Sequence, residues 1–93
     1  MKNYVKTYMK YFGYDISDFI PCEICGKKSS EIHHLEPRSI AKAKENFIDN
    51  LMALCRECHD ECGKSRSMND TAKLIHRKKL LQVKTDHETI RFI

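Results

Sequence analysis

Four of the five cysteines fall in two closely spaced pairs, and their type and spacing indicate metal chemistry. Each pair has the form Cys-x2-Cys, and 29 residues separate the first pair, Cys22 and Cys25, from the second, Cys55 and Cys58. Such pairs bind Zn²⁺ as thiolates, and a connection of that length can return the second pair to the first. Gly26 allows a tight turn after the first pair. We therefore predict a structural Zn²⁺ site with four cysteine ligands.

Three histidines near these pairs do not fit a finger with two cysteines and two histidines. His33 follows Cys25 by only eight residues and is adjacent to His34, which is the wrong spacing for that site. Neighbouring side chains of a strand face opposite ways, so we do not expect His33 and His34 to bind one ion together. One of them can hold a metal while the other does different work. His59 directly follows Cys58, and on a helix it projects about 100° away from that ligand.

Asn50 precedes the second apolar segment and has two interpretations. An asparagine carbonyl can accept the ring N–H of a histidine and fix its tautomer. Asp49 and Asn50 together are also ordinary turn residues, and this interpretation is favoured when Asn50 is considered alone.

Taken in order, these residues resemble the HNH endonuclease family. Residues 31–37 (EIHHLEP) are similar to its first motif strand, and residues 50–59 (NLMALCRECH) to its second strand and helix. The resemblance covers about residues 20–63. It implies a small α+β fold, in which a ββα-metal (His-Me finger) core carries the tetrathiolate zinc site. The N-terminal and C-terminal helices that flank this core are predicted from the residue patterns given below.

The resemblance also implies roles for the site residues. His34 would be the general base that takes a proton from the water attacking a phosphodiester, and Asn50 would orient its ring. His33 and His59 would hold a catalytic divalent ion, and the products would carry a 5′-phosphate and a 3′-hydroxyl. Gly63 occupies the place where some relatives add a histidine, so only two protein ligands are expected. Because two imidazoles make a soft site, we predict better activity with Mn²⁺, Ni²⁺ or Co²⁺ than with Mg²⁺.

Several further residues have weaker assignments. Arg38 lies between the two motif halves, and we hypothesise that it helps to hold the substrate. The basic run over residues 73–79 fits a solvated helix face and a phosphate-binding face equally well. His76 and His87 lie outside the motif and are expected at the surface. Cys62 is expected to be a free thiol, because four thiolates already complete a tetrahedron.

Elements that would position these residues follow from apolar spacing. Four apolar side chains at helical spacing predict an amphipathic helix over residues 2–12, ended by Gly13: Val5, Tyr8, Met9 and Phe12. Residues 31–35 and 51–54 are expected to be short strands. A short helix should run from Cys55 to Gly63, with the glycine ending it.

A last helix is expected near the C-terminus. Ser67 and Asp70 resemble a capping box, which predicts a helix from there to about Leu81. Its apolar residues would be Leu74, Ile75, Leu80 and Leu81. Residues 83–93 give no clear signal. The length of 93 residues allows one small domain, in which residues 1–20 lead in, residues 21–63 form the zinc-stapled core and residues 64–93 form a basic helix and tail.

The composition limits the partners and the cellular compartments that we expect for the chain. Seventeen Lys and Arg against thirteen Asp and Glu give +4, and four thiolates with one Zn²⁺ would lower this to +2. This charge permits a polyanionic partner. No apolar run approaches the length of a membrane helix, and the lysines of residues 1–6 precede no apolar segment, so neither membrane insertion nor secretion is expected. We expect the chain in the cytoplasm of a bacterial or phage-infected cell, where thiols stay reduced.

The leading hypothesis is a metal-dependent DNA endonuclease of low sequence specificity, or one targeted by a protein partner, because no residues remain for a second, sequence-reading domain. Small proteins similar to this one often belong to phages, where some support DNA packaging. The alternative is a non-catalytic zinc module that binds nucleic acid or protein, and a third, weaker hypothesis is a redox switch through Cys62 and the zinc thiolates. The oligomeric state stays open.

Overall fold

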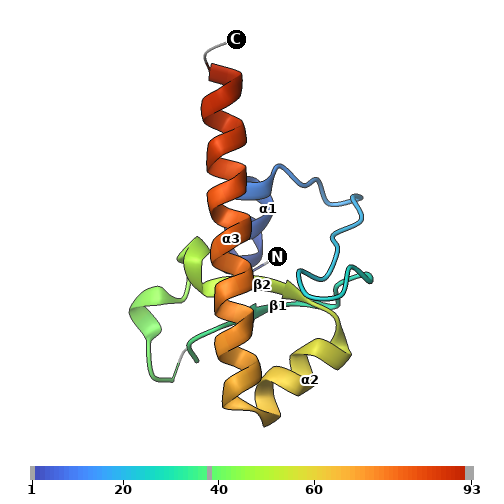
Figure 1. Ribbon diagram of the computed structural model, residues 1–93, viewed down its shortest axis with the longest axis vertical. Coiled ribbons are helices and arrows are strands. Elements are labelled where there is room, and N and C mark those ends of the chain that lie inside the picture. The colour runs from blue at the N-terminus through green and yellow to red at the C-terminus, as the bar shows by residue number, and fades with distance from the viewer. Residues whose placement is uncertain (1, 38, 92–93) are drawn as a thin grey trace.

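The computed structural model describes residues 2–37 and 39–91, and from Lys84 onward it describes only the backbone. The fold is small and α+β, as predicted, with three helices and one two-stranded sheet in the described residues (Figure 1). The elements follow in the order α1 (Asn3–Phe12), β1 (Glu31–His34), the 3-10 turns η1 (Lys42–Lys44) and η2 (Ile48–Asn50), β2 (Leu51–Leu54), α2 (Arg56–Lys64) and α3 (Arg66–Arg91).

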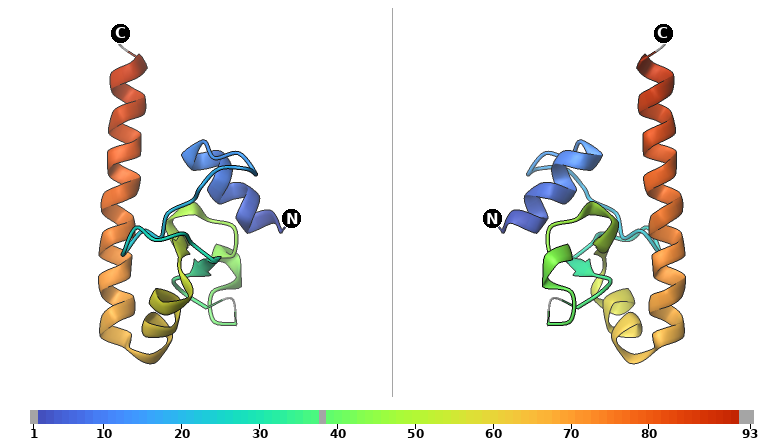
Figure 2. Two further views of the ribbon diagram at one scale, coloured as in Figure 1. Left: turned by 90° about the vertical axis from the view of Figure 1, so that its right-hand side faces the viewer. Right: turned by 90° about the vertical axis from the view of Figure 1, so that its left-hand side faces the viewer.

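The sheet is covered on both faces. Strands β1 and β2 are antiparallel, with His34 opposite Leu51 and His33 opposite Met52. All four residues of β2 are buried. Two of them, Leu51 and Ala53, pack with Tyr8 of α1, while the alternate two pack with the cysteines and α3. A strand enclosed in this way needs apolar residues throughout, which explains the uninterrupted sequence LMAL. Figure 2 shows α1 and α3 on either side of the strands.

Helix α1 begins one residue later than its pattern predicts, ends at the predicted residue, and covers the small core as expected. Tyr8 is fully buried, and the partly buried Tyr4 and Phe12 pack beside it. Gly13 ends the helix with φ of 73°, a left-handed conformation that glycine adopts without a steric cost. The N-terminal helix therefore closes one face of the sheet.

The boundary between α2 and α3 differs from the prediction. Gly63 does not end α2, which runs to Lys64 with Ser65 following it. Ser65, rather than Ser67, caps α3, because its Oγ accepts the backbone N–H of Met68 at 3.2 Å. The capping residue of α3 therefore lies two residues before the predicted one. A serine in this place ends one helix and begins the next.

Helix α3 is longer and differently oriented than its apolar residues suggest. It continues to Arg91, because the residues after Leu81 include no glycine or proline to stop it. Leu74 and Leu81 are 62% and 60% exposed, while Ala72 is buried. Its C-terminal part extends beyond the rest of the molecule (Figure 1). Among the described residues no helix combines the length and apolar character needed to span a membrane.

His76 is buried, which corrects its expected surface position. It is 1% exposed on the inner face of α3, where Nδ1 lies 2.8 Å from Oε1 of Glu23 and Nε2 lies 2.7 Å from the carbonyl oxygen of Ile48. The hydroxyl of Tyr8 donates to the other Glu23 oxygen at 2.6 Å. Burial, and then the Glu23 carboxylate, raise the pKa of Tyr8, so it remains a donor. This buried network joins α1, η2 and α3 to the residue between the first two cysteines.

Candidate functional site

The four paired cysteines converge on one point. Their Sγ atoms all lie within 4.8 Å of one another, and the Sγ atoms of Cys25 and Cys55 are 3.6 Å apart. A tetrahedral site with Zn–S bonds of about 2.3 Å separates its sulfurs by about 3.8 Å. The turn at Cys22 is closed by the N–H of Gly26, whose φ of 81° requires glycine. The cluster can therefore hold one metal ion with no rearrangement of the backbone.

The ionisation of these thiols also fits a metal site. Burial raises the pKa of Cys22, but the backbone N–H groups of Cys25, Cys55 and Ile24 outweigh it and bring the pKa to about 7. Burial and the neighbouring thiols raise the pKa of Cys58. Four sulfurs this close cannot all ionise side by side unless a cation compensates them. The donor set thus suits a divalent, thiophilic ion.

His33 and His34 project to opposite faces of β1, as adjacent strand residues should. The ring of His33 lies on the face of α2, with its centroid 4.9 Å from that of His59 and the two rings nearly perpendicular at 88°. The ring of His34 lies on the other face, where it meets the edge of Tyr4 of α1 at a centroid distance of 4.5 Å. The structure therefore brings His33 and His59 together and keeps His34 beside them at the end of the strand.

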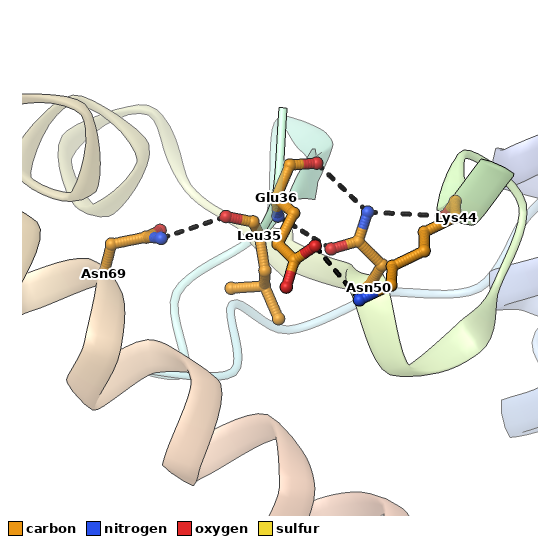
Figure 3. Close-up of polar contacts among 5 residues, drawn as sticks. All are labelled: Leu35, Glu36, Lys44, Asn50 and Asn69. Carbon is orange, nitrogen blue, oxygen red and sulfur yellow. Dashed lines mark hydrogen bonds and ion pairs between the residues drawn. The ribbon is translucent and has the colours of Figure 1, made fainter. Parts of the chain in front are cut away.

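Asn69 of α3 fixes the tautomer of His33. Its Nδ2 donates to the carbonyl oxygen of Leu35 at 3.0 Å, so its Oδ1 is turned toward His33 and lies 3.1 Å from Nε2 (Figure 3 shows the Leu35 contact). An amide oxygen only accepts, so Nε2 of His33 carries the proton and Nδ1 has the lone pair. Burial lowers the pKa of His33, and the rings of His59 and His34 add to this effect against the contact with Asn69, which raises the pKa. A neutral ring with a defined lone pair is what metal ligation needs.

His59 also suits a ligand. Its Nδ1 is buried and has no hydrogen-bond partner among the described residues. Carboxylate oxygens of Glu31 and Asp60 lie 3.5 and 3.8 Å from this atom. A buried polar atom without a partner is costly in free energy, and a bound cation would remove that cost. The residues present at His33 and His59 therefore fit a divalent ion.

The backbone holds His34 in one tautomer as well. Its Nε2 lies 3.0 Å from the carbonyl oxygen of Glu45. Because that oxygen only accepts, Nε2 is protonated and Nδ1 is the atom that can accept a further proton. The loop between the strands thus holds the ring of His34 with Nε2 as the donor.

Asn50 forms its described hydrogen bonds with the backbone of the loop between β1 and β2. This corrects the direct contact with the His34 ring that was expected. Its Oδ1 accepts the N–H of Glu36 at 2.7 Å, while its Nδ2 donates to the carbonyl oxygens of Glu36 and Lys44 at 3.1 and 3.3 Å (Figure 3). Asn50 is only 5% exposed. Lys44 precedes Glu45, whose carbonyl contacts His34. Within the described contacts, Asn50 therefore reaches His34 through the backbone.

Two sequence-based assignments lie outside the described residues. Arg38, the expected substrate contact, is one, and the side chain of His87 is the other. Cys62 is buried and outside the metal cluster, as expected for a free thiol. The contact of Asn69 with His33 was not expected from the sequence. An asparagine inside a helix is intrinsically unfavourable, which is the signal that could have drawn attention to it.

Comparison with known proteins shows which family part of the chain is similar to. The protein-family model described as HNH endonuclease matches residues 22–65. This segment includes β1, β2, α2 and all four clustered cysteines. A protein named mitochondrial DNA mismatch repair protein mutS homolog, from Sarcophyton glaucum, is 38% identical over 42 residues, or 41% of this chain and 4% of that protein. The chain thus spans a small fraction of that relative. No solved structure matches the chain significantly. Residues 22–65, just under half of the chain, are thus similar to the HNH endonuclease family.

Proposed function

We propose that the chain is a metal-dependent endonuclease that hydrolyses DNA phosphodiester bonds at the end of β1. The observation that supports this most is the arrangement of three histidines within the HNH segment. The rings of His33 and His59 are 4.9 Å apart, and His34 is the next residue on the same strand. A phosphodiester lying across the end of β1 is within reach of groups on both faces of the strand.

His34 is the proposed general base. Donation from Nε2 to the carbonyl of Glu45 leaves Nδ1 as the proton acceptor. Nδ1 takes a proton from the attacking water as the new O–P bond forms. The P–O3′ bond breaks, and the departing 3′ oxygen takes a proton from solvent, to which His34 later releases the proton that it gained. The products are therefore a 5′-phosphate and a 3′-hydroxyl.

Asn50 is a positioning residue in this proposal. It ties Glu36, just after β1, to Lys44, just before the carbonyl that contacts His34. Because its amide makes three contacts to backbone atoms, it fixes the loop at both ends. The loop in turn holds the ring of His34 in the orientation that the reaction needs.

His33 and His59 are the proposed ligands of the catalytic ion. A divalent ion bound there would neutralise charge on the phosphoryl oxygens and on the departing 3′ oxygen. Asn69 keeps the His33 ring in the tautomer with a lone pair on Nδ1. The cysteine cluster is proposed to hold Zn²⁺ in a structural role, since four thiolates leave no open position.

DNA is the proposed substrate because the matched family consists of endonucleases, and because the relative carries a DNA mismatch repair name. We also propose low sequence selectivity, or targeting by a protein partner such as a phage packaging protein, with the 93 residues forming one domain. Arg38 stays a proposed substrate contact.

The test is plasmid cleavage by the zinc-loaded protein across Mg²⁺, Mn²⁺, Ni²⁺ and Zn²⁺. Wild type is compared with His34→Ala, and His87→Ala, which lies outside the HNH segment, is the matched control. We expect nicking by wild type and by His87→Ala, and a loss of about 10²- to 10⁴-fold in rate in His34→Ala, which is typical for removal of a general base. Zinc content and melting temperature show that the variants are folded.

Two results would contradict the proposal. Cleavage that persists at the wild-type rate in a folded His34→Ala protein would remove His34 from the reaction. A folded, zinc-loaded wild type that binds DNA but cleaves it with none of these ions would favour the non-catalytic zinc module.

A further inference from the structure

We propose that one face of α3, formed by Lys73 and Arg77, binds the phosphate backbone of the substrate strand beside the scissile bond. This inference rests on the proposed nuclease function and extends it beyond the HNH segment, which ends at residue 65. It also divides the basic run of residues 73–79 into residues that contact substrate and residues that do not.

The first observation is a cleft of about 490 Å³ between α3 and the loop that precedes β2. Lys73 and Arg77 line it from the helix, and Lys44 lines it from the loop. Leu35 and Glu36, the two residues after β1, line it as well. The cleft therefore begins where the strand with the candidate catalytic histidines ends.

The second observation is the register of α3. Asn69, Lys73 and Arg77 are spaced by four residues, so they follow one another along one face of the helix. Asn69 contacts His33. With a rise of 1.5 Å per residue, Lys73 lies about 6 Å and Arg77 about 12 Å further along the axis. A strand leaving the candidate metal site along this face would meet the two cations in turn.

The third observation is the charge of the cleft. The carboxylate of Glu36 is paired with Lys44 at 3.1 Å, whereas no ion pair occupies Lys73 or Arg77 within the described residues. Asp49 is the remaining anion of the lining. The cleft thus has two cations on α3 that are available to phosphates.

The rest of the basic run is arranged differently. The ammonium group of Lys79 lies over the ring of Phe12, 4.7 Å from its centroid. Lys78 is exposed and does not line the cleft. Lys78 is therefore a matched control for Arg77, being its neighbour on the same helix with the same charge.

The lining also suits a nucleic acid strand more than a free anion. Tyr11, Phe47 and Leu81 form part of the walls, and Phe47 and Leu81 are 56% and 60% exposed. Apolar and aromatic groups of this kind can contact sugars and base faces while cations contact phosphates.

The test measures binding of a labelled DNA duplex to the zinc-loaded protein, with no further divalent ion added so that cleavage does not interfere. The dissociation constant is followed against salt concentration for wild type, Lys73→Ala, Arg77→Ala, the double variant and Lys78→Ala. Each lost phosphate contact should reduce the slope of log K against log salt by about 0.9, which corresponds to about fivefold weaker binding at 0.15 M salt. The double variant should bind about thirtyfold more weakly.

Lys78→Ala should retain the wild-type slope. Unchanged slopes in Lys73→Ala and Arg77→Ala would overturn the proposed phosphate contacts, and so would an equal loss in Lys78→Ala, which would indicate a diffuse charge effect. In either case, plasmid cleavage by wild type with loss in His34→Ala would leave the nuclease proposal intact. A wild type that neither binds nor cleaves DNA would contradict both.

Discussion

Asn69 lies just outside the segment that matches the HNH endonuclease family, and it contacts a histidine inside that segment. It lies four residues into α3, yet its amide spans from the carbonyl of Leu35 to the ring of His33. The contact to Leu35 removes the ambiguity in the orientation of the amide, because only Nδ2 can donate to a carbonyl. The tautomer of His33 follows from that orientation. Asn69 thus fixes the ring of His33, the proposed metal ligand, from outside the matched segment.

Replacement of Asn69 should therefore weaken metal binding more than folding. We expect Asn69→Ala to lower the affinity of the histidine site for Ni²⁺ or Mn²⁺ by about 10- to 100-fold, the usual cost of losing a hydrogen bond behind a ligand. Asn69→Asp, which keeps an acceptor for Nε2, should restore most of it. Calorimetric titration of the zinc-loaded protein with Ni²⁺ or Mn²⁺ measures the affinity of each variant. Ser67→Ala, at an exposed position of the same helix, is the control. Wild-type affinity in Asn69→Ala, alongside lost binding in His33→Ala, would show that Asn69 does not position the ring.

The ligand atoms also predict the order of metal ions. Two imidazoles, and no carboxylate among the proposed protein ligands, favour softer ions over Mg²⁺. At equal millimolar concentrations we expect faster plasmid nicking with Mn²⁺, Ni²⁺ or Co²⁺ than with Mg²⁺. Initial rates at saturating DNA give the comparison. Equal or faster cleavage with Mg²⁺ would mean that oxygen ligands, from the substrate or from other side chains, dominate the site.

Among the elements, those with local signals were predictable and those set by tertiary packing were not. Helix α1, both strands and the cysteine cluster follow from spacing that is visible over a few residues. The opposite orientations of His33 and His34 follow from strand geometry alone. The orientation of α3 could not be predicted, because the side of the helix that is buried depends on contacts between His76 and distant residues. Its partners Glu23 and Ile48 lie 53 and 28 residues earlier in the sequence. The indirect route from Asn50 to His34 depends on the conformation of a loop that no local pattern specifies.

His76 makes the docking of α3 testable. Replacing it with alanine leaves the Glu23 carboxylate buried, with both side chains of the wild-type pair at most 1% exposed. Loss of one partner of a buried pair typically costs about 3–5 kcal/mol. We therefore expect His76→Ala to lower the free energy of unfolding by about that amount in urea denaturation of the zinc-loaded protein. Leu74→Ala, at 62% exposure on the same helix, should change it by only about 0.5 kcal/mol. Similarly small effects of both substitutions would show that contacts other than the His76–Glu23 pair hold α3 in place.

At the scale of the whole molecule, the chain has two small cores that share one thin sheet. One lies between β2 and α1, and the other contains the cysteines and Ala72 of α3. A chain of 93 residues with cores this small commonly needs an additional cross-link. A metal ion held by the cysteine cluster would provide it, because the cluster joins the turn before β1 to the start of α2. These are also the elements that present His33 and His59.

Zinc removal should therefore unfold the chain and abolish both metal sites together. A strong chelator should remove one zinc per chain with a large loss of helical circular dichroism, and Cys25→Ala should behave in the same way. Cys62→Ala removes a buried thiol outside the cluster, and it should retain one zinc per chain. Acid should act like the chelator, because protons compete for the thiolates. The raised pKa of Cys58 means that this competition already operates above neutral pH, and zinc affinity should fall more steeply below the pKa of Cys22, which is about 7. Unchanged circular dichroism after complete zinc removal would show that the apolar cores hold the fold without the metal, and the histidine site would then be independent of the cysteine cluster.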